Sequence, residues 1–271
     1  MRTGEESRLI IEKCGKIDYM YGIPLFGSSM GLLLKMVESG ELKKPVWIAT
    51  VNPEFVMATW KDGEFLKMLQ ERTSVNVVDG VGLAWANEVQ LRITNDELRI
   101  IKIVKRIFFG AIEGVKVLGG GYKNKIISGV DLVDELCALA EKTNKTVFFY
   151  GGWDDRSERT AKYFLKKYPK LKVVGAQAED FNFEIKVDFL FVCRAMKKQE
   201  EWINEHLHEL KVGVVIGLGR TFDYYSGELP RAPRWVRGMG LEWLYSFFTD
   251  KGRRKRKLDL PKFVLKTLFQ G

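Results

Sequence analysis

Five short polar or glycine-rich segments hold the residue types that could bind a ligand or transfer a proton. They are Thr50–Asn52, Asp79-Gly80, Gly151-Gly152, Cys193–Gln199 and Gly217–Asp223. Glycine lets a backbone approach a phosphate closely, and a carboxylate can accept a proton. The chain has only 2 histidines, both in the polar run 204–209, which excludes most chemistries that need a histidine base or ligand. We therefore expect any proton transfer to fall to carboxylates.

Each segment also has a purely structural interpretation. Asn52-Pro53 is a good helix start, because asparagine caps a helix and proline fits its first position. The Asp79-Gly80 and Gly151-Gly152 pairs could be plain turns, and Gln199 could sit in the first turn of a helix. All five segments follow apolar runs, and this shared position favours ligand binding. The sequence contains no G-x-x-x-x-G-K-[ST] or G-x-G-x-x-G motif that would indicate a different phosphate-binding site.

The apolar runs before these segments predict a parallel sheet. We expect strands at 46–51, 75–78, 146–150, 172–176, 187–193 and 212–218, and helices at 53–72, 131–142, 157–168 and 198–210. The strands are continuous apolar runs, as in a sheet covered on both sides. Residues 91–127 show no clear period. The predicted fold class is α/β, a Rossmann-like, mostly parallel sheet with helices on both faces, whose ligands bind at the carboxyl ends of the strands.

The end of the chain carries most of its positive charge. Residues 228–271 contain 11 Lys and Arg against 4 Asp and Glu, a net charge of +7 out of +9 for the whole chain. The basic run 251–257 precedes an apolar tail at 258–269. We therefore expect an α/β catalytic core at 1–218 and a C-terminal basic amphipathic appendage at 219–271. Cations beside aromatic residues suit an anionic membrane, a phosphate-bearing ligand or nucleic acid.

Composition excludes several other classes of protein. No stretch approaches 18 uncharged apolar residues, and the N-terminus lacks the apolar core of a signal peptide. The three cysteines, Cys14, Cys137 and Cys193, are far apart and form no C-x-x-C pair, so neither a disulfide framework nor a zinc site is expected. We expect a cytoplasmic protein.

An ordered series of motifs connects the chain to a known family. The motifs are Y-G-I-P (21–24), A-T-V-N-P-E (49–54), V-D-G-V-G-L (78–83), S-G-V-D-L (128–132), F-Y-G-G (149–152), K-Q-E-E-W-I (198–203), F-D-Y-Y-S-G (222–227), R-A-P (231–233) and G-L-E-W-L-Y (240–245). With this series the chain resembles the WecG/TagA/CpsF family of bacterial glycosyltransferases, glycosyltransferase family 26, from about residue 21 to its end.

The resemblance implies a specific activity. Members transfer an N-acetylmannosamine-type sugar from a UDP donor to undecaprenyl-diphosphate-linked N-acetylglucosamine, for teichoic acid, common antigen or capsule. It implies that Asp79 is the general base, with Thr50 and Gln199 in the active site and Arg253 and Arg256 at the acceptor diphosphate. We expect further substrate contacts from Asn52, Gly80, Gly151, Gly152, Asp223 and Arg231.

The same resemblance sets the expected partners and location. The motifs contain no D-x-D, so no metal and no cofactor besides the UDP-sugar substrate is expected. Because a polyprenyl-diphosphate-linked acceptor is held in a membrane, we expect a peripheral enzyme on the inner face of the plasma membrane, anchored to its anionic surface by the apolar tail. The alternative is that the tail packs on the core or on another subunit. A homo-oligomer remains open.

Two alternatives to this activity are kept. The basic end of the chain could bind nucleic acid, although apolar residues follow its basic run, whereas a nucleic-acid arm usually stays polar. We therefore expect no nucleic-acid partner. Lys197, Arg220 and Ser246 depart from the family's usual residues, so an inactive family member, or one acting on another sugar pair, also remains open.

Overall fold

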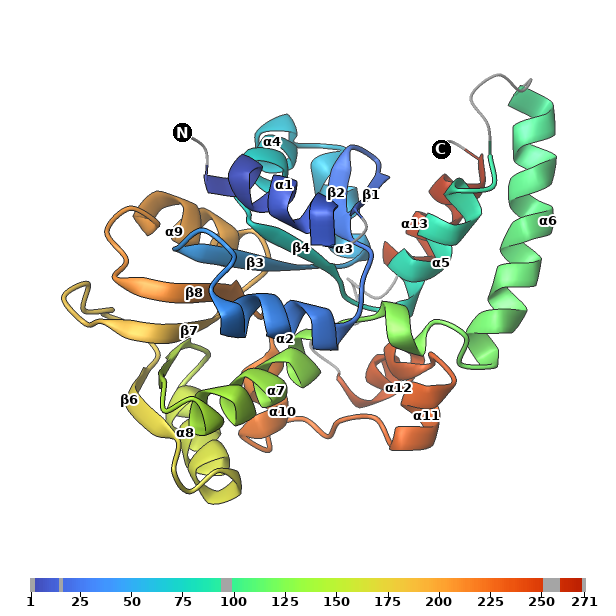
Figure 1. Cartoon of the computed structure of the whole chain (residues 1–271). Coiled ribbons are helices and arrows are strands. Elements are labelled where there is room, and N and C mark those ends of the chain that lie inside the picture. Colours follow the sequence, from blue (N-terminus) through green and yellow to red (C-terminus); the bar gives the residue numbers. More distant parts are fainter. Residues whose placement is uncertain (1–2, 15–16, 94–98, 251–258, 270–271) are drawn as a thin grey trace.

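The computed structural model describes residues 3–14, 17–93, 99–250 and 259–269. Its centre is an eight-stranded sheet with the order β1-β2-β4-β3-β8-β7-β5-β6 (Figure 1). Strand β1 pairs with β2 in antiparallel orientation, and every other pairing is parallel. The prediction of a mostly parallel α/β sheet is confirmed.

The strands are β1 Ile17–Met20, β2 Ile23–Phe26, β3 Val46–Val51, β4 Val75–Val78, β5 Thr146–Gly151, β6 Lys172–Gln177, β7 Val187–Cys193 and β8 Val212–Gly217. The helices before β5 are α1 Thr3–Cys14, α2 Met30–Ser39, α3 Pro53–Thr59, α4 Gly63–Glu71, α5 Val81–Gln90, α6 Arg99–Leu118, the 3₁₀ helix η1 Lys123–Lys125 and α7 Gly129–Lys142. Those after β5 are α8 Arg156–Lys167, α9 Lys198–His206, α10 Thr221–Tyr225, α11 Arg234–Gly238, α12 Glu242–Thr249 and α13 Asp259–Phe269.

Helices cover both faces of the sheet because the central strands are apolar on both sides. Along β3, Ile48 faces the cluster built with α1, α2, α7 and α8, while Trp47 and Ala49 face the opposite side. That opposite side is covered by α3, α4, α5, α9 and α13. All six side chains of β3 are buried. Burial on both faces is what an uninterrupted run of apolar residues predicts.

The six predicted strands are all present, with ends that agree to within one residue. The helix expected at 53–72 is broken into α3 and α4, because Asp62 caps a new helix by accepting a hydrogen bond from the Phe65 backbone N–H (3.1 Å). The prediction that residues 91–127 have no regular period was wrong. Residues 99–118 form the 20-residue helix α6.

The structure does not confirm residues 219–271 as an appendage to a core at 1–218. Helix α10 packs against α7 and α8, and α13 packs against α3, α5 and α6. Phe263 of α13 is fully buried in the cluster that also contains Phe55 and Leu83. The apolar tail therefore packs largely against the core, although Leu265 and Phe269 are exposed. The basic run 251–257, with Arg253 and Arg256, lies outside the described residues.

Candidate active site

Two adjoining clefts open at the carboxyl ends of β3, β4 and β8. The first, of about 620 Å³, is bounded by α5, α7, α11 and α12; the second, of about 540 Å³, by β8, α8 and the loop before α9. Four residues line both clefts: Asn52, Asp79, Ser128 and Glu242. A reaction between two bound molecules would take place at this junction, which holds two carboxylates.

The strand ends fix the polar residues of the junction. The Asp79 N–H donates to the Val51 carbonyl (2.7 Å), so Asp79 extends the ladder between β3 and β4. Gly80 follows at φ +93°, where a side chain would be strained. Asn52 caps α3, accepting from the N–H groups of Glu54 (2.9 Å) and Phe55 (3.3 Å). Its predicted capping role is confirmed, and the same residue faces both clefts.

Thr50 and Gln199 line the second cleft but their polar groups are engaged in the scaffold. The Thr50 hydroxyl donates to the Gly217 carbonyl (2.9 Å), which joins β3 to β8. Gln199 is buried; its Oε1 accepts from the Gly219 N–H (2.7 Å) and its Nε2 donates to Glu200 (2.6 Å). Thr50 thus fixes the end of β8 and Gln199 fixes the loop that follows it, whose residues line the second cleft.

A buried carboxyl group supports this loop. Glu200 is fully buried, and burial raises its pKa to about 7 although hydrogen bonds from Gln199 and the Lys197 N–H oppose the rise. A Cβ atom on Gly217 would lie 2.7 Å from Glu200 Oε1 and 2.8 Å from Gln199 Nε2. Only glycine therefore fits at position 217 while Gln199 keeps its place.

The glycine pair after β5 shapes a turn rather than lining either cleft. Gly151 and Gly152 have φ of +92° and +85°, and a Cβ on Gly151 would lie 2.5 Å from the Cys193 carbonyl oxygen. Neither glycine is among the residues that line the two clefts. The turn instead delivers Trp153 and Arg156, which do line the second cleft.

Asp223 lies beneath the second cleft, where it holds two arginines. It is fully buried and accepts from Arg156 Nη1 (2.6 Å) and from Arg220 Nε. Arg220 also pairs with Asp250 (2.6 Å). Both guanidinium groups lie near the Trp153 ring, at 5.4 and 6.0 Å from its centre. Asp223 is not among the residues that line either cleft; its carboxylate orients two arginines that do line the second cleft, beside Trp153. Its predicted contact with substrate stays a prediction.

The first cleft contains a network of charged side chains. Arg231 donates to Asp131 (2.8 Å) and its Nε lies 3.7 Å from Glu242 Oε1. Burial opposes ionisation of Asp131, but hydrogen bonds from Arg231 and Ser128 and the charge of Arg237 outweigh it, so the pKa of Asp131 is lowered. Burial raises the pKa of Glu242, although the charges of Arg231 and Arg237 oppose the rise. Glu242 is thus the carboxyl group of the junction that is more readily protonated than an ordinary glutamate.

Both clefts are rich in cationic side chains. Lys123, Arg231, Arg234 and Arg237 line the first cleft, and Arg156, Arg194 and Arg220 line the second. Arg231 Nε is buried and, among the described residues, makes no hydrogen bond; the Glu242 carboxyl group lies 3.7 Å away as its ion-pair partner. Within residues 3–14, 17–93, 99–250 and 259–269, no three His, Cys, Asp or Glu side chains could hold a metal ion together.

The structure assembles most of the predicted site residues and adds others. Thr50, Asn52, Asp79, Gly80, Gln199 and Arg231 line one or both clefts. Sequence reasoning missed Trp153, Arg156, Arg194 and Glu242. A signal existed for each of them. Trp153 and Arg156 follow F-Y-G-G within four residues, Arg194 lies within the predicted segment Cys193–Gln199, and Glu242 lies within G-L-E-W-L-Y.

Comparison with known proteins finds relatives of this chain. Residues 109–271 match the "Glycosyl transferase WecG/TagA/CpsF family". An N-acetylglucosaminyldiphosphoundecaprenol N-acetyl-beta-D-mannosaminyltransferase of Bacillus subtilis (strain 168) is 27% identical over 260 residues, which are 92% of this chain and 90% of the relative. A protein of the same name from Staphylococcus aureus (strain NCTC 8325 / PS 47) is 24% identical over 86% of each chain.

Proposed function

The chain belongs to the WecG/TagA/CpsF family of glycosyltransferases, and from this premise we propose the reaction that it catalyses. It transfers an N-acetylmannosamine-type sugar, with inversion, from a UDP donor to undecaprenyl-diphosphate-linked N-acetylglucosamine. The product enters cell-wall or surface-polysaccharide synthesis. The B. subtilis and S. aureus relatives are named for transfer to this type of acceptor. Because that acceptor is held in a membrane, the enzyme acts at the inner face of the plasma membrane.

The observation that carries the proposal is the pair of cationic clefts that share one polar junction. In the second cleft, Arg156 and Arg220 bind the diphosphate of UDP and Trp153 packs against its uridine. Both arginines are held by the buried Asp223 carboxylate, so their charges are oriented before the donor binds. In the first cleft, the cations at Arg231, Arg234 and Arg237 bind the acceptor diphosphate.

Chemistry takes place at Asp79, between the two clefts. Its carboxylate removes the proton of the acceptor hydroxyl as that oxygen attacks the anomeric carbon on the face opposite UDP. The new C–O bond forms, the bond to UDP breaks, and the electron pair leaves with UDP, whose charge the arginines of the second cleft stabilise. Asp79 is suited to this role because the ladder between β3 and β4 holds its backbone rigidly.

The experiment is a donor screen with the purified full chain and a short-chain diphosphate-linked N-acetylglucosamine acceptor. We expect one UDP-sugar of the N-acetylmannosamine type to be consumed with release of UDP, in the presence of a chelator. If no UDP-sugar is consumed although UDP binds, the chain is an inactive family member. If UDP does not bind either, the assignment of the second cleft is wrong.

Replacing Asp79 by asparagine tests the base. We expect Asp79→Asn to lower turnover by roughly a hundredfold or more, the usual scale for losing general base catalysis. Asp180→Asn is the matched control, since Asp180 is exposed at a positive φ that asparagine tolerates and lies outside both clefts. Glu242→Gln should cost less than Asp79→Asn; the reverse order would assign the base to Glu242.

A further inference from the structure

Helix α6 has its apolar and polar faces reversed relative to an ordinary surface helix. The three residues that it buries are Arg106, Gly110 and Glu113. Six of its apolar side chains are between 46% and 76% exposed: Ile100, Val104, Ile107, Phe108, Val115 and Leu118. At 3.6 residues per turn these six fall on one side of the helix. An amphipathic helix of a water-soluble domain normally turns such a stripe toward the core.

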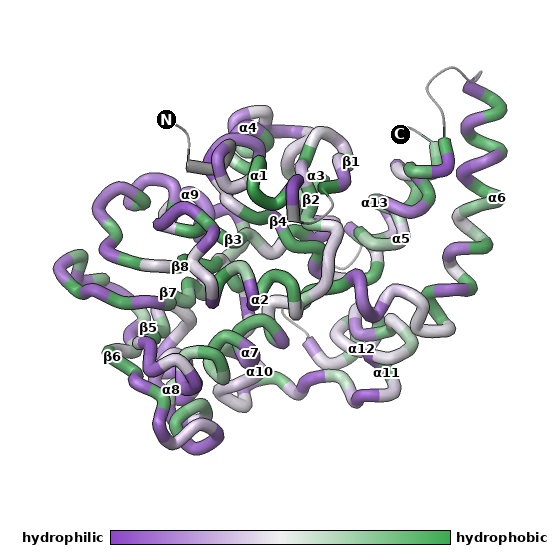
Figure 2. Tube along the Cα trace, in the orientation of Figure 1, coloured by the Kyte–Doolittle hydropathy of each residue, from purple (hydrophilic) through white to green (hydrophobic). Residues whose placement is uncertain are grey.

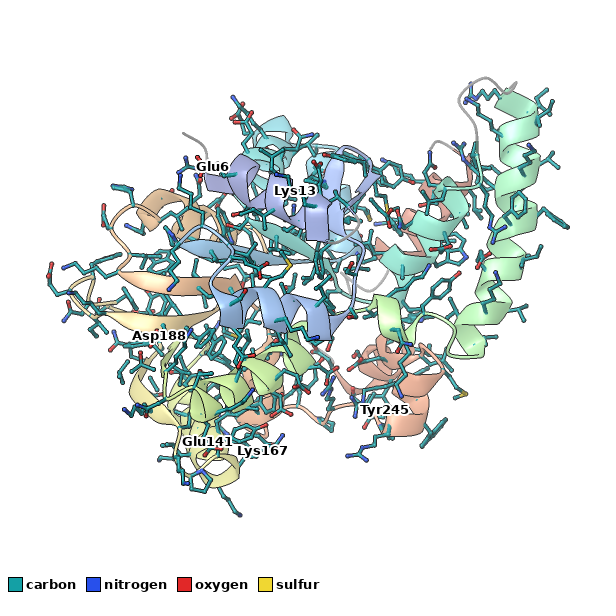
Figure 3. The ribbon with its side chains drawn as sticks, viewed as in Figure 1. Glu6, Lys13, Glu141, Lys167, Asp188 and Tyr245 are labelled. Atoms are coloured by element: carbon teal, nitrogen blue, oxygen red, sulfur yellow. The ribbon has the colours of Figure 1, made fainter. Side chains whose placement is uncertain are left out.

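The buried contacts of α6 hold the stripe outward. The Gly110 carbonyl accepts from Trp85 Nε1 of α5 (2.9 Å), and a Cβ on Gly110 would lie 3.0 Å from Leu268 of α13. Glu113 accepts from Tyr122 and pairs with Arg92 (2.9 Å) and Lys116 (2.8 Å). Rotating the helix to bury its stripe would break these contacts, so the apolar face is a fixed surface. Figure 3 shows side chains projecting along the outer side of α6, away from the body of the protein.

The charge of α6 is compatible with an anionic partner. The helix carries five basic residues, Arg99, Lys102, Lys105, Arg106 and Lys116, and its single acid, Glu113, is buried. Lys105 and Lys116 fall along one edge of the apolar stripe, given 100° of rotation per residue. A long apolar stripe bordered by lysines is the pattern of a helix that lies in a lipid interface. Among the described residues, no helix is long and apolar enough to cross a membrane.

The stripe leads toward the first cleft. The end of α6 touches the turn between α11 and α12, since a Cβ on Gly240 would lie 2.9 Å from Val117 and one on Gly120 would lie 2.8 Å from the Gly238 carbonyl oxygen. In the two helices that flank this turn, Trp235 of α11 is 68% exposed and Phe248 of α12 is 69% exposed. Figure 1 and Figure 2 show α6, α11 and α12 at one edge of the molecule, with apolar residues along α6.

We propose that α6, together with the exposed aromatic residues of α11 and α12, is the surface that docks the protein on an anionic lipid bilayer. Helix α6 lies along the interface with its stripe among the acyl chains and its lysines at the headgroups. The first cleft then opens beside the lipid surface, so the diphosphate of a lipid-linked acceptor reaches Arg231 and Arg237 without leaving the headgroup region. Only this last step rests on the proposed function.

The test is co-sedimentation of the full chain with vesicles of phosphatidylglycerol and phosphatidylethanolamine, compared with vesicles of phosphatidylcholine. The variant is Val104→Glu/Phe108→Glu/Val115→Glu, on three side chains that are 60%, 60% and 71% exposed. The matched control is Leu9→Glu/Leu165→Glu/Val174→Glu, which adds the same charge at exposed apolar positions of α1, α8 and β6. Circular dichroism checks that both variants are folded.

We expect the wild type and the control to bind the anionic vesicles and the α6 variant to bind them at least tenfold more weakly. Turnover of a short-chain, water-soluble acceptor should be equal in all three proteins. Unchanged vesicle binding by the α6 variant would overturn the proposal. So would light scattering that shows a wild-type oligomer converted to monomers by the α6 changes, because a second copy would then cover the stripe. A wild type that binds vesicles but transfers no sugar would refute the proposed reaction and leave the docking surface intact.

Discussion

Truncating Phe263 tests whether the end of the chain is part of the core. The Phe263 ring is fully buried, stacks on Trp60 with 6.1 Å between ring centres, and meets the edge of Tyr21 at 6.5 Å. Phe263→Ala removes this ring from a closed apolar cluster. Such substitutions cost about 3–5 kcal/mol of unfolding free energy, because burial is lost and a cavity remains. Phe269 of the same helix is 45% exposed, so Phe269→Ala should cost under about 1 kcal/mol.

Thermal and urea unfolding of the two variants measure this difference. At about 2–4 °C per kcal/mol for a chain of this size, Phe263→Ala should lower the melting temperature by about 10 °C and Phe269→Ala by no more than about 4 °C. Equal, small shifts in both variants would refute the packing of α13 and support the interpretation that the tail is detached from the core. If the large shift is found, deletion of residues after Asp250 will destabilise the fold, and point substitutions are the right test of any membrane contact in this region.

The other predictions concern the second cleft and its support. Arg156→Gln should weaken UDP binding, measured by titration calorimetry in a chelator, by about tenfold or more, the scale of one charge-assisted hydrogen bond; Arg159→Gln, on the same helix but outside the clefts, should bind UDP like the wild type. Gly217→Ala should cost about 1–3 kcal/mol of stability, since the new methyl group overlaps Gln199 and Glu200, and an unchanged melting temperature would contradict that geometry. The pKa of Glu200 is raised from 4.5 to about 7 in the folded state. The folded protein therefore holds a proton that the unfolded chain has lost between those pH values, and unfolding free energy should fall by about 2–3 kcal/mol as pH rises from 4.5 to 7. Glu200→Gln should remove this slope in urea titrations across that range; a slope that persists in the variant would assign it to another group.

Much of the fold follows from local patterns in the sequence. The runs at 46–51, 75–78 and 187–193 are strands with the predicted ends, because an apolar segment bounded by a cap or a turn has few other options. Asn52-Pro53 starts α3 as expected, since a cap depends on neighbouring residues alone. Strand ends are likewise set by neighbouring residues, so Asp79 and Thr50 could be placed at the carboxyl ends of their parallel strands.

The sequence could not indicate which face of a helix meets the protein. Residues 99–118 mix apolar and basic groups, yet the face that packs is the one with Arg106 and Glu113. Glu113 finds its partners at Arg92 and Tyr122, which lie before and after the helix in the chain. The tail was expected to leave the core because the sequence does not show which distant residues its apolar face meets. Its basic run and its lysines suggested an anchor, whereas Tyr21 and Trp60, far away in sequence, receive Phe263.

The sequence by itself determined the strands, the turn and cap residues at their ends, the family motifs and the scarcity of histidine. Only the tertiary structure decided that Asp223 is buried beneath Arg156 and Arg220, that Gly151 and Gly152 shape a turn, and that Glu242 joins Asp79 where two clefts meet. Strands and caps arise from interactions between residues close in the chain. The junction needs segments about 160 residues apart to meet, and their meeting depends on the summed burial of the whole sheet and its helices.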